Sequence, residues 1–258
     1  MESIQKKSGF LVLVFLLLVH LSFSQRADTT KKSTHFSGSV SVTNNGISLV
    51  PTFSLGKPAA IFIFSVGNRR LSFEPDLRFA LEGKPWSFLF WWRYKVVQSG
   101  KFKLTAGVHP AINFRTFRLP VNGDSSDVIV VRRFLAGELA PNYLLSKNVS
   151  VGIYYLFSIG FDATTPKYSH FITANSNISN ISLPGKLRMN LTPQFFYLKQ
   201  DKRDGFYFTS SVTVSKKNFP LSISSIINKT ISGNILGSKI FLWNASIIYS
   251  FNKNYVKR

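Results

Sequence analysis

Hydrophobic and polar residues alternate along most of this chain, most clearly near its end. In residues 239–252, KIFLWNASIIYSFN, the odd positions from Phe241 to Phe251 are apolar and many even positions are Asn or Ser. Successive side chains of a β-strand point to opposite faces, so such a strand has one apolar and one largely polar face. Aromatic residues at both ends of the apolar face are typical of a lipid-facing strand between two interfacial girdles. A soluble edge strand alternates similarly, so the interpretation depends on whether the pattern recurs.

The pattern does recur, with turn residues between the runs. Asn45-Gly46 predicts a tight hairpin between the first two runs. The candidate strands are 36–43, 47–55, 59–66, 70–81, 86–97, 101–114, 128–145, 149–161, 168–181, 186–199, 205–215, 219–228 and 239–252.

The lengths of the connections favour an even number of strands. Single-chain bacterial barrels have short periplasmic turns and longer outer loops. If the last strand ends in the periplasm, the longer connections all fall outside, and this order holds back to Ile47. We therefore predict an all-β protein, an antiparallel transmembrane β-barrel of about 12 strands over 47–251, with 14 strands as the alternative. The barrel domain would cover 47–258, and 25–46 would be a periplasmic segment in which 36–43 forms an additional strand, hairpin or plug.

The first 24 residues read as an export signal. Lys6 and Lys7 precede the apolar run 9–21, and Ser22 and Ser24 are small residues at the expected cleavage site. The apolar run is shorter than the ~20 residues of a spanning helix, which favours a cleaved signal peptide over a membrane anchor. An exported chain without cysteine must hold itself together by its core or by barrel closure.

The formal net charge is +21. A basic excess of this size often indicates nucleic-acid binding. The export signal argues against nucleic acid as a partner, so we expect outer-membrane lipids, lipopolysaccharide phosphates or anionic solutes instead.

Strand register predicts where the charges inside the barrel lie. Pairing Leu81 with Trp86 keeps the apolar faces of two strands aligned and places Glu74 opposite Arg93. Direct cross-strand neighbours have Cβ atoms ~5 Å apart, so these side chains should meet. Pairing Val97 with residue 101 places Lys95 opposite Lys103 in the next hairpin. The expected lumen charge cluster is Glu74, Asp76, Arg78, Arg93, Lys95, Lys103 and Glu138.

This cluster has two interpretations. It is either a salt-bridge network that fills a narrow barrel or a basic constriction that favours anions. The opposite face of the strands should meet lipid. The expected lipid-facing aromatic residues are Trp86, Phe88, Phe90, Trp92, Tyr94, Trp243, Tyr249 and Phe251.

Catalytic chemistry is not expected. The stretch SHFITANSN around His170 faintly resembles the His-x-Ser-Asn segment of lipid A deacylases, but Ile172 stands where the nucleophile should be. His109 shares a strand face with Asn113 and has no serine at a catalytic spacing. Three scattered histidines after the signal, with no cysteine, predict no metal site, and we expect no cofactor. An outer-membrane lipid hydrolase is therefore only a remote alternative.

Taken together, the Ser24-Gln25 junction, about a dozen alternating strands and the aromatic last strand resemble an outer-membrane β-barrel protein. The Ser-Gln junction and the Lys-, Asn- and Ser-rich composition resemble such proteins from Bacteroidetes-type bacteria. The resemblance implies a place in the bacterial outer membrane and insertion by the barrel-assembly machinery. It leaves the oligomeric state open.

Three hypotheses for function follow. The first is a porin-like passive channel with a preference for small anionic solutes. The second is a non-conducting barrel, either structural or binding lipopolysaccharide or another ligand. The third, a secreted β-sandwich or lipocalin-like binder, is disfavoured because a row of outward aromatic side chains would form a sticky patch in water.

Overall fold

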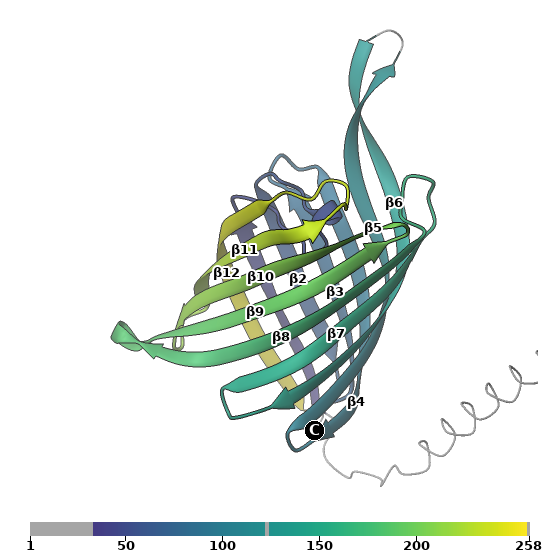
Figure 1. Ribbon diagram of the computed structural model, residues 1–258. Helices are drawn as coiled ribbons and strands as arrows, with labels where there is room; N and C mark the ends of the chain where they lie inside the picture. The colour runs from purple at the N-terminus through teal and green to yellow at the C-terminus, as the bar shows by residue number, and fades with distance from the viewer. Residues whose placement is uncertain (1–32, 122–123, 257–258) are drawn as a thin grey trace, which may run out of the picture. The chain divides into compact units, whose positions relative to one another are not determined.

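A single closed barrel of antiparallel strands makes up the part of the chain that the computed structural model describes, residues 33–121 and 124–256. Each strand pairs with its sequence neighbours, and β1 closes the barrel against β12 (Figure 1). The expected signal peptide lies outside the described residues. The twelve strands are β1 (Ser33–Thr43), β2 (Ala59–Gly67), β3 (Leu71–Ala80), β4 (Pro85–Ser99), β5 (Phe102–Val121), β6 (Asp124–Leu144), β7 (Val149–Gly160), β8 (Tyr168–Leu183), β9 (Leu187–Gln200), β10 (Arg203–Lys216), β11 (Leu221–Gly233) and β12 (Phe241–Val256).

The predicted fold class and strand number are confirmed, but the set of strands is different. The run 36–43 belongs to β1, a full barrel strand, whereas 47–55 forms no strand. The predicted barrel start at residue 47 and the predicted tight hairpin at Asn45-Gly46 are therefore wrong. Because 47–55 is part of a connection and not a strand, β1 begins at the same end of the barrel as the short turns. It therefore fits the expected order of short inner turns and longer outer loops.

The β1–β2 connection, residues 44–58, folds back on itself. The backbone N–H of Leu55 donates a hydrogen bond to the carbonyl of Gly46 at 2.8 Å, and Gly56 turns the chain with a φ of +74°. Pro51 begins a short 3₁₀ helix, η1 (Pro51–Phe53). Ile47 is buried, and Leu49 and Phe53 line the space inside the barrel, so these apolar residues face inward and not toward lipid. Alternation reports a buried face, and this one packs inside the barrel mouth.

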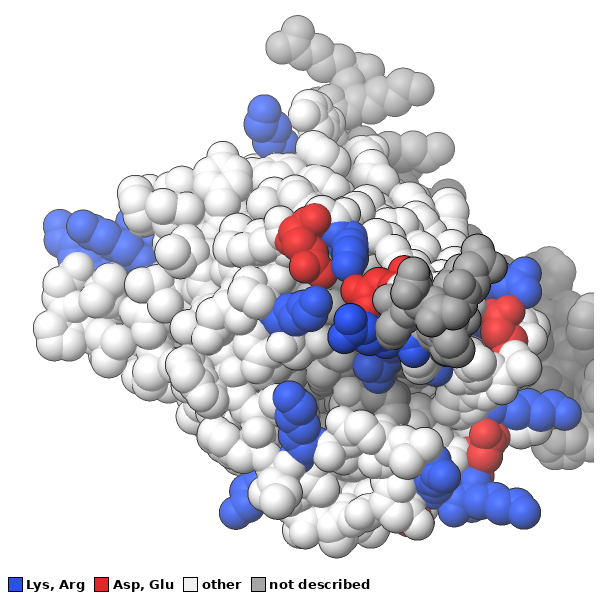
Figure 2. Space-filling model, turned by 90° about the horizontal axis from the view of Figure 1, so that it is seen from above, with Lys and Arg blue, Asp and Glu red and all other residues white. Residues whose placement is uncertain are grey.

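Apolar side chains cover the outside of the barrel. Trp92 and Trp243 are 48% and 53% exposed, and Phe73 packs against Trp92 with ring centroids 4.7 Å apart. Figure 2 shows charged side chains gathered near the middle of the view and at its projecting parts, with an almost uncharged wall between them. Such a belt is stable against hydrocarbon and would be sticky in water. Among the described residues, no helix has the length and apolar character of a membrane span.

One expected lipid-facing residue points inward. Trp86 is 1% exposed and Ser87 beside it is also buried, because the β3–β4 pairing shifts between Arg78 and Phe79. A β-bulge places an extra residue in one strand and re-aims its side chain. The prediction for Trp86 is therefore wrong. The other expected aromatic residues lie on the outer face, half-exposed or exposed.

Candidate functional site

The barrel encloses a cavity of about 510 Å³, lined by inward side chains of β2 to β9 and by the β1–β2 connection. This volume is within the range of small-molecule pockets. The ring of Phe53, from the connection, packs edge-on against Phe134 of β6 with centroids 5.1 Å apart. The connection therefore forms the outer wall of the cavity.

Arg93 is held between two carboxylates on one side of the cavity. Its Nε donates to Glu138 Oε1 at 2.6 Å and its Nη1 donates to Glu74 Oε2. The hydroxyl of Tyr154 donates to the other oxygen of Glu138 at 2.7 Å. Gly107, directly opposite Glu138 in the β5–β6 ladder, leaves the space for that carboxylate, since a Cβ there would lie 2.7 Å from Glu138 Oε1.

A second ion pair lies nearer the outer end. Arg78 donates two hydrogen bonds to Asp76, at 2.8 and 2.6 Å, and its guanidinium lies 5.2 Å from the centre of the Trp86 ring. Both guanidiniums of this wall are therefore neutralised by carboxylates. Arg93 serves two carboxylates, so the five groups together carry one excess negative charge.

Five of the seven residues expected in the lumen charge cluster meet in this way: Glu74, Asp76, Arg78, Arg93 and Glu138. The structure does not bring Lys95 and Lys103 together. The strands turn at residues 100–101 instead of 98–100, so Val97 pairs with Leu104 and, beyond a bulge at Val96, Lys95 pairs with Thr105. Lys103 is exposed near the β4–β5 turn, and neither lysine has an ion-pair partner among the described residues.

The register of β3 and β4 also differs from the prediction. Ser72, not Glu74, lies opposite Arg93, and Glu74 lies opposite Trp91. The predicted contact between Glu74 and Arg93 forms all the same, because a long side chain reaches its diagonal neighbour.

Trp91 and His109 are cavity residues for which the sequence predicts no functional role. Their ring centroids lie 3.6 Å apart, and the Arg93 guanidinium lies 4.1 Å from the centre of the Trp91 ring. His109 is 3% exposed and lines the cavity. Alternation places His109 on the inner face, but its contact with the Trp91 ring depends on the β4–β5 register, which differs from the predicted one.

Asn113 is also buried on the cavity wall, on the same face of β5 as His109. Its Nδ2 donates to the backbone carbonyl of Trp86 at 3.3 Å. Its Oδ1 is buried without a hydrogen-bond partner, as is Nδ1 of His109.

Aromatic packing fills the other side of the lumen toward its outer end. Phe196 and Tyr207 stack with centroids 4.7 Å apart, and Phe171 contacts Phe196 at 4.9 Å. Ile235 from the β11–β12 connection belongs to this cluster, and Val50 from the β1–β2 connection packs against it. Both connections therefore narrow the outer mouth of the barrel.

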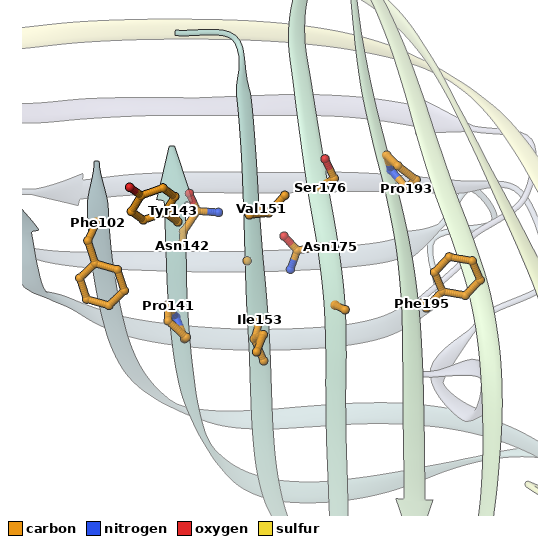
Figure 3. A pocket seen from close by; sticks show the side chains of 12 residues that line it. Phe102, Pro141, Asn142, Tyr143, Val151, Ile153, Asn175, Ser176, Pro193 and Phe195 are labelled. Carbon is orange, nitrogen blue, oxygen red and sulfur yellow. The ribbon is translucent and has the colours of Figure 1, made fainter. Parts of the chain in front are cut away.

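A second hollow, of about 530 Å³, lies on the outside of the barrel (Figure 3). Exposed apolar residues such as Tyr143, Ile153 and Phe195 line it, which places it on the lipid face. Pro141 and Pro193 lie at positions where the β6–β7 and β8–β9 ladders have no paired residues. Proline lacks the N–H that a ladder needs, so the wall is least tightly bonded beside this hollow.

Comparisons with known proteins yield structural matches only. No protein-family model and no curated protein match the chain. Among solved structures, an outer membrane channel from Pseudomonas putida F1 is 10% identical, with 89% of this chain and 98% of that one covered and a TM-score of 0.49. The CymD monoaromatic hydrocarbon channel is 10% identical, with 88% and 89% covered and a TM-score of 0.44. The β domain of the Bordetella autotransporter BrkA is 7% identical, with 85% and 98% covered and a TM-score of 0.42.

Likeness at this level carries no information on solute or mechanism, and the fold rests on the strand pairing itself. A closed barrel with an apolar outer belt is the one β-structure that spans a membrane without an open edge. The protein is an outer-membrane β-barrel. The expected Bacteroidetes-type origin stays a prediction.

Proposed function

We propose that the barrel is a channel for small solutes, narrowed by the β1–β2 connection inside its outer mouth. The observation that carries this proposal is the cavity of about 510 Å³ within the barrel, whose wall includes Arg93 and Glu74. The inner face is also polar on strands away from the cavity, for example at Thr209, Asn228 and Asn244. A polar interior is typical of barrels that hold water.

The expected preference for anions has little support at the charge cluster. Each arginine there is ion-paired, which favours the salt-bridge interpretation over a basic constriction. Lys95 and Lys103, on the inner face of β4 and β5, are basic groups without an ion-pair partner among the described residues. We therefore expect only a weak preference for anions over cations, produced by these two lysines at the periplasmic end.

Conductance in planar bilayers tests the channel. We expect discrete conductance steps from the purified protein and larger steps when residues 47–55 are replaced by a short Gly-Ser linker. Reversal potentials under a salt gradient measure the selectivity. Absence of conductance in both proteins, with the barrel shown to be folded, would overturn the proposal.

The second candidate is a non-conducting barrel that binds a ligand. The contacts of Val50 and Ile235 with the aromatic cluster favour it, because they bring two connections over the outer mouth. A protein that binds a solute in its lumen but stays silent in bilayers even after the linker replacement would support this candidate.

We also propose that the barrel has no catalytic activity. Nδ1 of His170 lies 2.8 Å from the hydroxyl of Tyr155, which leaves no serine as its partner among the described residues. Incubation with lipopolysaccharide should leave the mass of lipid A unchanged, and loss of an acyl chain would contradict this.

Lipopolysaccharide and the barrel-assembly machinery stay proposed partners. The exposed side chains of Lys202 and Arg203, in and beside the β9–β10 connection at the outer end, are suited to phosphate groups. Replacing both by Gln should weaken lipopolysaccharide co-purification, and an unchanged yield would contradict this role.

A further inference from the structure

Two positions on the inner face of β5, His109 and Asn113, carry polar side chains whose hydrogen bonding is incomplete. His109 lines the lumen cavity, and its Nδ1 is buried without a hydrogen-bond partner among the described residues. Asn113 lines the same cavity and uses only its amide N–H₂, toward Trp86. Buried polar groups are nearly always paired, so two unpaired ones on one cavity wall point to a missing partner.

The two groups differ in what they require. Asn113 Oδ1 is an acceptor and requires an N–H or O–H donor. A neutral imidazole offers one donor and one acceptor, so His109 can serve either kind of group. Only Ala111 separates them on this face of the strand, so one small molecule can reach both.

The charges of the cavity limit what such a molecule can be. Arg93 and Arg78 are already bound by carboxylates and offer no free cation for an anionic group. The excess of one carboxylate in this wall disfavours an anion further, since like charges repel strongly where water is scarce. The wall therefore favours an uncharged molecule over an anion.

The rest of the lining mixes aromatic and apolar side chains with uncharged polar ones. Phe134 and Phe171 present aromatic rings to the cavity, and Leu89, Ala111, Ala136 and Leu156 add apolar surface. Thr173, Asn175 and Gln194 are among the uncharged polar residues of the wall. Aromatic walls with a few convergent polar groups suit a flat ring.

We propose that the lumen cavity binds a small, uncharged, ring-bearing molecule with N–H or O–H groups, which His109 and Asn113 recognise by hydrogen bonds. The unpaired atoms of both side chains are shielded from solvent, so binding includes a small rotation of each. This inference deepens the proposed function by naming the class of solute. It rests on that function only in requiring that solutes enter the lumen.

Binding to the full barrel, folded in detergent micelles, tests the proposal. Theophylline and caffeine form a matched pair: both are neutral bicyclic rings at pH 7, but theophylline has one N–H that caffeine replaces by N–CH₃. Calorimetry should show theophylline binding about tenfold more tightly, the ratio expected for one hydrogen bond to a buried group. The anion 4-hydroxybenzoate should bind more weakly than neutral benzamide.

Variants assign the binding to the named residues. His109→Phe keeps a ring against Trp91 and should weaken theophylline about tenfold, as should Asn113→Leu. His170→Phe, on the outer face, is the matched control and should leave the affinity unchanged. Theophylline should also shift the ring ¹⁵N signals of His109 in ¹⁵N-histidine-labelled protein, a change that a purely structural role would not produce. Each variant is checked for folding by its migration in cold SDS.

Equal affinity for theophylline and caffeine, tighter binding of the anion, or full affinity in His109→Phe would overturn the proposal. So would failure of both theophylline and benzamide to bind. A barrel that conducts ions but binds neither molecule overturns this inference alone. A barrel that binds theophylline but never conducts overturns the channel alone.

Discussion

The indole N–H of Trp86 donates a hydrogen bond to the backbone carbonyl of Phe53, with a nitrogen–oxygen distance of 2.6 Å. The β-bulge of β4 turns this ring inward, and Phe53 lies in the connection that was expected to be a membrane strand. A single contact therefore joins the two places where the sequence-based prediction of the barrel wall was wrong. It fastens the β1–β2 connection to the inside of the wall.

Replacing Trp86 by Phe tests this contact. The variant loses the hydrogen bond and leaves the carbonyl of Phe53 unpaired, which should cost about 1 kcal/mol of unfolding free energy. Urea unfolding in vesicles, followed by migration in SDS gels, measures the loss. Trp92→Phe, on the lipid face, is the control and should change stability much less. Equal losses in the two variants would show that the inward position of Trp86 has no special role.

Gly107 should tolerate no side chain. A Cβ there would lie 2.7 Å from Oε1 and 3.0 Å from Cγ of Glu138, so Gly107→Ala must displace that carboxylate from Arg93. Strain of this kind costs about 1–3 kcal/mol. Gly137→Ala, on the neighbouring strand, is a matched control because its nearest neighbour would be 3.8 Å away. Urea unfolding of both variants gives the comparison, and a neutral Gly107→Ala would contradict the packing described for Glu138.

Arg93 should matter more to stability than any exposed arginine. Arg93→Met leaves Glu74 and Glu138 without their cation, and breaking a buried pair costs about 3–5 kcal/mol. Arg93 is partly exposed, so solvent screening reduces the expected loss to about 2–3 kcal/mol. Adding Glu138→Gln should recover part of it. Arg133→Met, whose arginine is well exposed, should have a much smaller effect, and the reverse order would contradict the account.

Acid should loosen the β7–β8 connection. The pKa of Asp162 lies below its ordinary value because Arg133 donates hydrogen bonds to its carboxylate, at 2.8 Å from the side chain and 2.6 Å from the backbone. A lowered pKa in the folded state means that this stabilisation is complete above the ordinary aspartate pKa. It is lost as the pH falls through the folded value.

The ¹³C titration of the Asp162 carboxyl measures this shift. The midpoint should lie below that of an unpaired aspartate and move upward in Arg133→Gln. Because Arg133 is well exposed and Asp162 lies in a connection, global unfolding should change little. An unchanged titration midpoint of Asp162 in Arg133→Gln would contradict the pairing of Asp162 with Arg133.

Much of the fold could be predicted because each strand of a transmembrane barrel alternates apolar and polar residues. The lengths of the connections indicate which end of the barrel faces outward. What failed depended on three local features. Residues 47–55 alternate because their apolar side chains pack inside the barrel, and alternation alone cannot distinguish that from a lipid-facing strand. The bulge before Ser87 re-aimed Trp86. The β4–β5 turn lies at residues 100–101 instead of 98–100, which separated Lys95 from Lys103.

The candidate site was predicted in part for a related reason. Long charged side chains such as Arg93 reach diagonal neighbours, so the ion pair with Glu74 survived a register error of two residues. His109 and Asn113 were placed on the correct face. That Nδ1 of His109 and Oδ1 of Asn113 have no hydrogen-bond partner could not be predicted, because it depends on interatomic distances in the folded barrel.

Closure of the barrel by β1 is the central claim, and cross-linking tests it most directly. Phe36 of β1 and Phe251 of β12 pack on the outer face with ring centroids 5.3 Å apart. The chain has no native cysteine, so Phe36→Cys with Phe251→Cys introduces a unique pair. A short bismaleimide added to outer membranes should join the two cysteines within one chain, while Phe36→Cys with Phe195→Cys should give no such product. No intramolecular product from the first pair would mean that the first and last strands do not meet.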